Sequence, residues 1–300
     1  MDPQPEQFSF TPGSTGTDVA QRLRAGGYLA DATTAEVVNL AAHLGKPILV
    51  EGPAGTGKTQ LAKSVAQITG RRLVRLQCYE GIDESKALYE WDYRKQLLWI
   101  QAARGEEGFD ADAIVADGKG IFDSRFLLAR PLLEAISADD PVVLLIDEVD
   151  RVDTETEALF LEVLAEHQVT VPELGSVEAK HIPLVFLTSN GSRDLSEALK
   201  RRCLFLYLDY PSAEREREIV HQHVPGLSVA LGEQLVGLVE SLRRMKLKKA
   251  PSVSETIDFA QMLTLLGSAE LDEATATYGL NVLLKYQEDI RTATAALARK

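Results

Sequence analysis

One eight-residue motif constrains the fold of this chain more than any other feature. Its residues are Gly52, Pro53, Ala54, Gly55, Thr56, Gly57, Lys58 and Thr59. The motif matches the phosphate-binding pattern G-x-x-x-x-G-K-[ST]. A short apolar run at 46–51 precedes it, and apolar residues at helical spacing (Leu61, Val65, Ile68) follow it. A strand, a glycine-rich turn and a helix in this order predict a parallel α/β sheet with a phosphate site at its edge.

The residue types of the motif explain how it would bind ATP. Glycines let backbone N–H groups turn toward a phosphate, and the following helix adds the positive end of its dipole. Lys58 is expected to reach the outer phosphates, and the Thr59 hydroxyl is expected to hold Mg²⁺. A chance match in an ordinary loop would lack the flanking strand and helix. We therefore predict that Gly52–Thr59 bind ATP.

The remaining apolar runs predict the rest of the fold. Together with 46–51, the apolar runs 141–146, 183–188 and 204–208 and a strand candidate at 72–77 give five strands, and helical stretches alternate with them. This alternation predicts a P-loop αβα sandwich with a five-stranded parallel sheet. After Pro211 the strand signals end, and helices are predicted near 213–223, 231–244, 252–266 and 272–284.

These patterns divide the chain into three parts. We expect a flexible N-terminal arm at 1–16, a large nucleotide-binding subdomain at 17–210 and a helical lid at 211–300. Residues 85–120 form an insert, predicted as one helix over 85–104 followed by an acidic loop. A further helix is predicted over 126–136, and a small hairpin near 169–171 and 175.

Polar residues follow two of the predicted strands. Asp147 and Glu148 end the most apolar run of the chain, which places both carboxylates at the edge of the sheet where ligands bind. We expect Asp147 to hold Mg²⁺ through water and Glu148 to polarise the attacking water. Asn190, at the end of the next strand, is a candidate to orient that water, although Asn-Gly is also a common turn pair.

Basic residues suggest a contribution from a second copy of the chain. Lys200, Arg201 and Arg202 precede the fifth strand, and an arginine there can stabilise transition-state charge on a neighbour's ATP. Arg202 is the first candidate and Arg201 the second, against the alternative of a solvated basic patch. The run from Arg243 to Lys249 is interpreted as a solvated helix end, with nucleic-acid or interprotomer contact as alternatives.

Composition limits the partners and the compartment. The formal charge is −13, from 45 acidic and 32 basic residues, so nucleic acid is not the expected partner. Two cysteines, Cys78 and Cys203, are too few for a disulfide framework and favour a reducing compartment. No stretch reaches the roughly 20 apolar residues that span a bilayer, so we expect a cytoplasmic protein without a membrane span.

The order of these motifs resembles the AAA+ superfamily over roughly 20–290, and within it the MoxR group. Residues 76–81 (LQCYEG) and 87–91 (ALYEW) resemble its CoxD-like subgroup, which is associated with maturation of molybdenum-containing carbon monoxide dehydrogenase and related hydroxylases. The resemblance implies an ATPase ring, typically a hexamer in that family, in which Glu148 is the catalytic base, Asn190 the sensor and Arg202 the finger in trans. It also implies a metal-enzyme client and a von Willebrand A-type partner.

The chain departs from the family pattern in its lid. Relatives often place an ATP-contacting arginine where this chain has Ser254. Either another residue such as Lys249 replaces it, or the lid is coupled to ATP more weakly. Two other classes of function also carry these motifs, namely a DNA-linked ring motor and a nucleotide-dependent scaffold that does not hydrolyse ATP. The charge argues against the first and Glu148 against the second.

Overall fold

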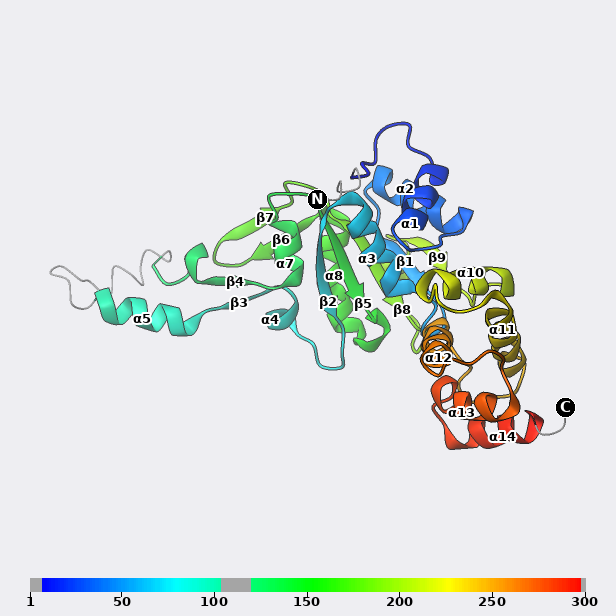
Figure 1. Ribbon diagram of the computed structural model, residues 1–300. Helices are drawn as coiled ribbons and strands as arrows, with labels where there is room; N and C mark the ends of the chain where they lie inside the picture. The colour runs from blue at the N-terminus through cyan, green and yellow to red at the C-terminus, as the bar shows by residue number, and fades with distance from the viewer. Residues whose placement is uncertain (1–6, 104–119, 298–300) are drawn as a thin grey trace. The chain divides into compact units, whose positions relative to one another are not determined.

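The computed structural model describes residues 7–103 and 120–297 (Figure 1). They form two compact units. The first contains the residues up to Glu51 and Thr59–Leu206, and the second contains Gly52–Lys58 and the residues from Tyr207 onward.

A five-stranded sheet organises the first unit. Its strands are β1 (Ile48–Glu51), β2 (Arg72–Gln77), β5 (Val142–Asp147), β8 (Leu184–Ser189) and β9 (Leu204–Tyr207), in the order β2-β5-β8-β1-β9. The pairs β2–β5, β5–β8 and β8–β1 are parallel. Every residue of β5 and β8 is buried, which explains their uninterrupted apolar sequences. The predicted five-stranded parallel sheet is confirmed.

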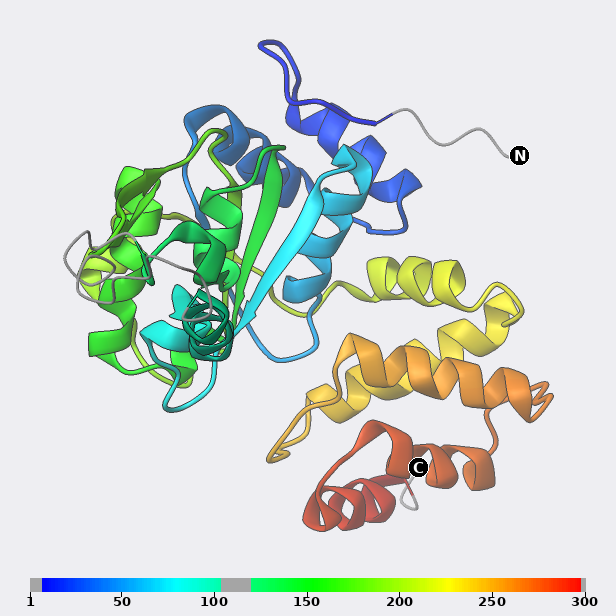
Figure 2. The ribbon, with the colours of Figure 1, turned by 90° about the vertical axis from the view of Figure 1, so that its left-hand side faces the viewer.

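Helices cover both faces of this sheet (Figure 2). On one face, α7 (Pro131–Ile136) and α8 (Thr154–Glu166) bury Leu132 and Phe160 in one cluster with Leu144. Val143 and Leu145 alternate with these strand positions and so point to the other face. The helices of that face are α1 (Gly16–Ala25), α2 (Ala32–Leu44) and α3 (Lys58–Thr69). The predicted αβα sandwich is therefore observed.

The insert differs from its prediction, because the expected single helix over 85–104 is broken. The chain forms α4 (Glu84–Ala87), β3 (Tyr89–Trp91) and α5 (Tyr93–Ala103). Trp91 is buried, and its ring lies 5.2 Å from that of Phe122. This aromatic packing favours an extended segment over a continued helix. Residues 104–119 of the predicted loop lie outside the described residues.

The predicted helix over 126–136 is also divided. A 3-10 turn, η1 (Ser124–Phe126), leads into β4 (Leu127–Ala129), which pairs antiparallel with β3. The helix α7 begins only at Pro131, since a proline is well suited to the first helical position but cannot sit inside a helix. The β3–β4 ribbon and α5 lie to one side of the five-stranded sheet (left in Figure 1).

Part of the predicted N-terminal arm makes defined contacts. The Phe8 N–H donates to the Ile68 carbonyl at 2.8 Å, and the Phe10 ring lies 6.5 Å from that of His43. Thr15 caps α1. Residues 1–6 of the predicted arm lie outside the described residues.

Shorter elements complete the first unit. They are η2 (Val149–Arg151), the hairpin β6 (Gln168–Val171) and β7 (Gly175–Glu178), and α9 (Glu197–Lys200). The hairpin lies where the sequence predicts one.

After β9 the second unit is helical. Its helices are α10 (Ala213–His223), α11 (Val229–Arg243), α12 (Val253–Leu265), α13 (Glu273–Leu283) and α14 (Gln287–Leu297). They share a core that includes Leu235, Phe259 and Leu280. The first four match the predicted helices closely, whereas α14 was not predicted.

The basic run 243–249 is not simply a solvated helix end. The Arg243 guanidinium is 12% exposed and donates with two nitrogens to Glu216, which is fully buried. It also donates to the Pro251 carbonyl at 2.9 Å. The interpretation is therefore wrong for Arg243, whereas the Arg244 side chain is 78% exposed.

Within the described residues, no helix combines the length and apolarity needed to cross a bilayer.

Candidate active site

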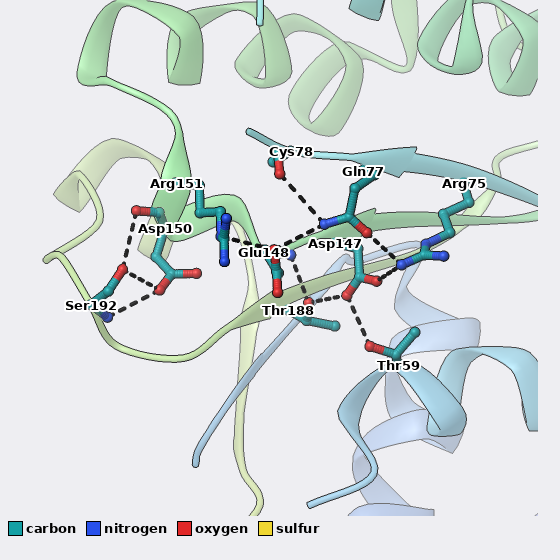
Figure 3. A network of polar contacts seen from close by, with 10 residues as sticks. All are labelled: Thr59, Arg75, Gln77, Cys78, Asp147, Glu148, Asp150, Arg151, Thr188 and Ser192. Atoms are coloured by element: carbon teal, nitrogen blue, oxygen red, sulfur yellow. Dashed lines mark hydrogen bonds and ion pairs between the residues drawn. The ribbon is translucent and has the colours of Figure 1, made fainter. Parts of the chain in front are cut away.

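Asp147 is the centre of a polar network at the end of β5 (Figure 3). It is 3% exposed. Its Oδ1 accepts hydrogen bonds from the Thr59 hydroxyl at 2.9 Å and the Thr188 hydroxyl at 2.5 Å. Its Oδ2 accepts from an Arg75 nitrogen at 2.5 Å. Three elements, α3, β8 and β2, thus supply donors to this one carboxylate, as the parallel topology requires at the carboxyl ends of strands.

Glu148 follows in a left-handed conformation, with φ of 57°. Such a conformation is uncommon for a residue with a side chain and is often retained at functional sites. Its N–H donates to the Thr188 hydroxyl at 2.9 Å. Its carboxylate accepts from the Gln77 amide at 3.0 Å and pairs with Arg151 at 2.8 Å. The side chain is 33% exposed, so water can reach it.

Arg75 and Gln77 are the residues of the network that sequence reasoning missed. Both lie on β2, and Gln77 is directly beside Asp147 in the register of the two strands. The signal was the two-residue period of the strand, which alternates buried Val74 and Leu76 with exposed Arg75 and Gln77. Two successive polar residues on one face of the strand, Arg75 and Gln77, indicate a polar neighbour on that face, and here that neighbour is the acidic pair.

A second acidic group adjoins the network. Asp150 is 4% exposed, and its Oδ2 accepts from the Ser192 N–H at 3.0 Å and the Ser192 hydroxyl at 2.6 Å. Its Oδ1 is buried without a hydrogen-bond partner among the described residues. Burial alone would raise the pKa of Asp150, but the donors from Ser192 and the backbone hold that pKa below its ordinary value.

A pocket of about 350 Å³ lies beside Asp150. Glu80, Arg151, Asn190 and Ser192 complete its lining. The predicted sensor, Asn190, follows β8 directly and is exposed. The structure therefore places Asn190 and Arg151 around one hollow, and Arg151 in turn contacts Glu148.

Cys78 lies directly after β2, and its N–H donates to the Asp147 carbonyl at 2.8 Å. Burial, reinforced by the nearby carboxylates of Asp147, Asp150 and Glu148, raises the pKa of this thiol to about 12. The thiol therefore stays protonated near neutral pH and contributes no nucleophile.

The glycine-rich loop Gly52–Gly57 connects β1 to α3. Lys58 is 6% exposed, and its ammonium donates to the carbonyls of Gly52 and Pro53, both at 2.7 Å. The Thr56 hydroxyl also donates to Pro53, at 3.0 Å. The Lys58 ammonium therefore binds to carbonyl groups of the loop that precedes it.

Two glycines of the loop are required by space as well as by conformation. A Cβ on Gly52 (φ 152°) would lie 2.0 Å from the Leu208 carbonyl oxygen. A Cβ on Gly55 (φ 78°) would lie 2.3 Å from Cβ of Ser252. No other residue fits either position without moving its neighbour.

The remaining predicted residues lie outside the Asp147 network. Arg202 is exposed and donates to the Ala198 carbonyl at 2.9 Å. Ser254 is exposed, and Lys249 pairs with Glu255 at 3.4 Å. Ser252, two positions before Ser254, is the lid residue that lies beside Gly55.

The oxygen donors around Asp147 fit Mg²⁺. This ion prefers oxygen ligands and is usually bound through one or two carboxylates together with substrate phosphates. The Thr59 hydroxyl uses its hydrogen on Asp147, so its lone pairs remain available to a cation. Thr59 and Asp147 are thus the residues that would hold the ion.

Comparison with known proteins identifies relatives of this chain. An uncharacterized protein from Staphylococcus haemolyticus strain JCSC1435 is 24% identical over 235 residues, covering 75% of this chain and 80% of the relative. An uncharacterized protein from Staphylococcus aureus strain USA300 is 23% identical, covering 74% and 80% respectively.

Among solved structures, the chain is similar to the RuvB Holliday junction branch migration motor of Thermotoga maritima. The TM-score is 0.48 at 16% identity, covering 89% of this chain and 69% of that one. A point mutant of the same protein gives a TM-score of 0.49, also at 16% identity, with coverage of 92% and 72%.

A family model also matches residues 47–203, which contain the glycine-rich loop, the acidic pair and four of the five strands of the central sheet. This match spans more than half of the chain. The chain therefore belongs to the AAA domain family, in its dynein-related subfamily.

Proposed function

We propose that this chain is an ATPase that binds Mg-ATP through Gly52–Thr59 and Asp147 and hydrolyses it. The observation that carries the proposal is the 2.9 Å hydrogen bond from Thr59 to Asp147, residues 88 positions apart in the sequence. It joins the last residue of the phosphate-binding motif to the acidic residue that ends β5. A hydroxyl and a carboxylate held together in this way are what magnesium coordination beside a phosphate needs.

The loop and Lys58 would bind the phosphates. Backbone N–H groups of the loop and the start of α3 favour negative charge there. Lys58 would exchange the Gly52 and Pro53 carbonyls for phosphate oxygens. Bound Mg²⁺ would neutralise charge on the β- and γ-phosphates.

Glu148 would act as the general base. Gln77 and Arg151 both contact its Oε2, so Oε1 can accept a proton from water while these two contacts hold the side chain in place. Asn190 would orient that water from the end of β8. Asn190 lines the same pocket as Arg151, which pairs with Glu148, so water in that pocket has access to the proposed sensor and to the partner of the proposed base.

The test is Glu148→Gln, which keeps the side-chain volume and removes the base. We expect the turnover number to fall by about 100-fold or more, with the affinity for ATP unchanged within a few-fold. Glu134→Gln is the matched control, because Glu134 pairs with Arg72 at the other end of β2. Equal turnover by the wild type and Glu148→Gln would contradict the assignment of Glu148.

We also propose that the chain works as a ring, in which Arg202 of one copy reaches the ATP of the next. Among the described residues, the Ala198 carbonyl holds this exposed arginine, and a single such bond could be exchanged for a neighbour's phosphate at little cost. Such a residue stabilises transition-state charge and is worth about 10³-fold or more in turnover.

The proposed cellular role is maturation of a metal-cofactor enzyme in the cytoplasm, with a von Willebrand A-type partner. It rests on the resemblance of residues 76–81 and 87–91 to the CoxD-like subgroup of MoxR proteins. Cells that lack the chain should accumulate molybdenum hydroxylase with an incomplete metal centre, and the wild type but not Glu148→Gln should restore it. Strong stimulation of ATP turnover by DNA, with normal hydroxylase in the deleted strain, would instead favour a DNA-linked motor.

A further inference from the structure

The ion pair between Arg75 and Asp147 has no part in the mechanism above. Asp147 is 4% exposed at its side chain and Arg75 is 45% exposed, so a half-solvated cation reaches a buried carboxylate. Their closest atoms are 2.5 Å apart. The same guanidinium nitrogen also donates to the side-chain oxygen of Gln77. Figure 3 shows Arg75 and Thr59 approaching Asp147 from different sides.

The donors around Asp147 differ in charge. Thr59 and Thr188 are neutral and share Oδ1, whereas Arg75 brings a full positive charge to Oδ2. An arginine side chain stays protonated in proteins, so this charge is permanent. It acts on any second cation that approaches the same carboxylate, and like charges a few ångströms apart repel even in a polar environment.

We propose that Arg75 is a built-in competitor of Mg²⁺ and sets the magnesium requirement of nucleotide binding. Its charge opposes metal binding at Asp147, so more Mg²⁺ is needed to fill the site. The same charge partly replaces the ion when Mg²⁺ is scarce, because it offsets the repulsion between Asp147 and the phosphates. The nucleotide affinity of the wild type should therefore change less between saturating Mg²⁺ and no Mg²⁺ than the affinity of a chain without Arg75. This inference rests on the proposed function.

The experiment measures equilibrium binding of a fluorescent ADP analogue to the full chain, across a titration of Mg²⁺ and in EDTA. Arg75→Gln should lower the half-saturating Mg²⁺ concentration by about fivefold and weaken binding in EDTA by a similar factor. Arg75→Lys keeps the charge and should stay within about twofold of the wild type. Arg72→Gln is the matched control on the same strand, since Arg72 is similarly exposed and pairs with Glu134.

The inference is overturned if Arg75→Gln needs as much Mg²⁺ for half-saturation as Arg72→Gln, or more. A second test asks where the charge acts. The effect of Arg75→Gln should vanish when Asp147 is replaced by Asn, and an effect that persists in that background would also refute the inference. Thermal unfolding of each variant shows that it is folded.

The two proposals fail in different ways. If the wild type binds no nucleotide at any Mg²⁺ concentration, the proposed function is wrong. If the wild type binds nucleotide with Mg²⁺ and Arg75→Gln shows the same dependence on the ion, only the role of Arg75 is wrong.

Discussion

Asp150 shows how single hydrogen bonds decide the charge state of a buried residue. The residue is 4% exposed, and burial alone would favour the neutral acid. Two donors from Ser192, with backbone donors of Asn190 and Asp150, hold the pKa below its ordinary value instead. Because the pKa of Asp150 is lower in the folded than in the unfolded chain, its ionised carboxylate stabilises the fold at pH values above the unfolded pKa of about 4. This contribution is lost as the pH falls through the folded value.

Ser192→Ala should therefore destabilise the protein in a pH-dependent way. The variant loses the 2.6 Å hydroxyl bond to Asp150, so we expect a loss of about 1–2 kcal/mol at pH 7 that shrinks below about pH 4. Urea unfolding at several pH values measures it. Ser241→Ala is the control, because the Ser241 hydroxyl donates to the Leu238 carbonyl and should give a loss independent of pH. A constant loss in both variants would show that Ser192 does not act through the Asp150 charge.

At the scale of elements, the sheet was predictable because burial on both faces leaves a direct record in the sequence. The apolar runs at 141–146 and 183–188 each lie within one residue of a strand of the structure, β5 and β8, whose residues are all buried. The position of Asp147 and Glu148 at the edge of the sheet followed from the same runs. The elements of the sandwich could therefore be predicted without any knowledge of long-range contacts.

The insert could not be predicted in this way, because its elements depend on distant partners. The strand β3 exists through pairing with β4, whose residues lie about 38 positions away in the register Trp91↔Leu127 or Tyr89↔Ala129. A short strand of this kind has no periodic signal of its own. Arg75 and Gln77 were missed for a related reason, since their role appears only when β2 is placed beside β5.

The buried ion pair of α10 and α11 gives a prediction at this scale. Arg243→Met should destabilise the second unit by about 3 kcal/mol, because it leaves the fully buried Glu216 carboxylate with only the Thr256 hydroxyl at 2.8 Å among the donors described here. Arg244→Met removes only an exposed pair with Glu240 and should cost about 0.5 kcal/mol or less. Chemical denaturation followed by circular dichroism compares the neighbouring variants. Equal stability of the two would contradict a structural role for Arg243.

At the scale of the whole molecule, the proposed ring divides each active site between two copies. A chain with Arg202→Ala keeps its own Glu148 but cannot supply an arginine to the ATP of the adjacent copy. A chain with Glu148→Gln lacks the base at its own site but still supplies Arg202 to the ATP of the adjacent copy. Each variant alone should be inactive, whereas a mixture contains interfaces with both intact residues.

Mixing the two variants should thus recover part of the ATP turnover, up to about a quarter of the wild-type rate if copies assemble at random. Turnover is measured across mixing ratios at constant total protein. Sizing with and without ATP reports assembly in parallel. A mixture that stays inactive although it assembles would place the charge-stabilising arginine elsewhere, with Arg201 as the next candidate.

Thr188, on β8, is hydrogen-bonded to both acidic residues at the end of β5. Its hydroxyl donates to the Asp147 carboxylate and accepts the N–H of Glu148. Asn190 stands two residues further along the same chain segment. A displacement of β8 against β5 would consequently move the proposed magnesium ligand, the proposed base and the proposed sensor together, so the proposed chemistry depends on the register of these two strands.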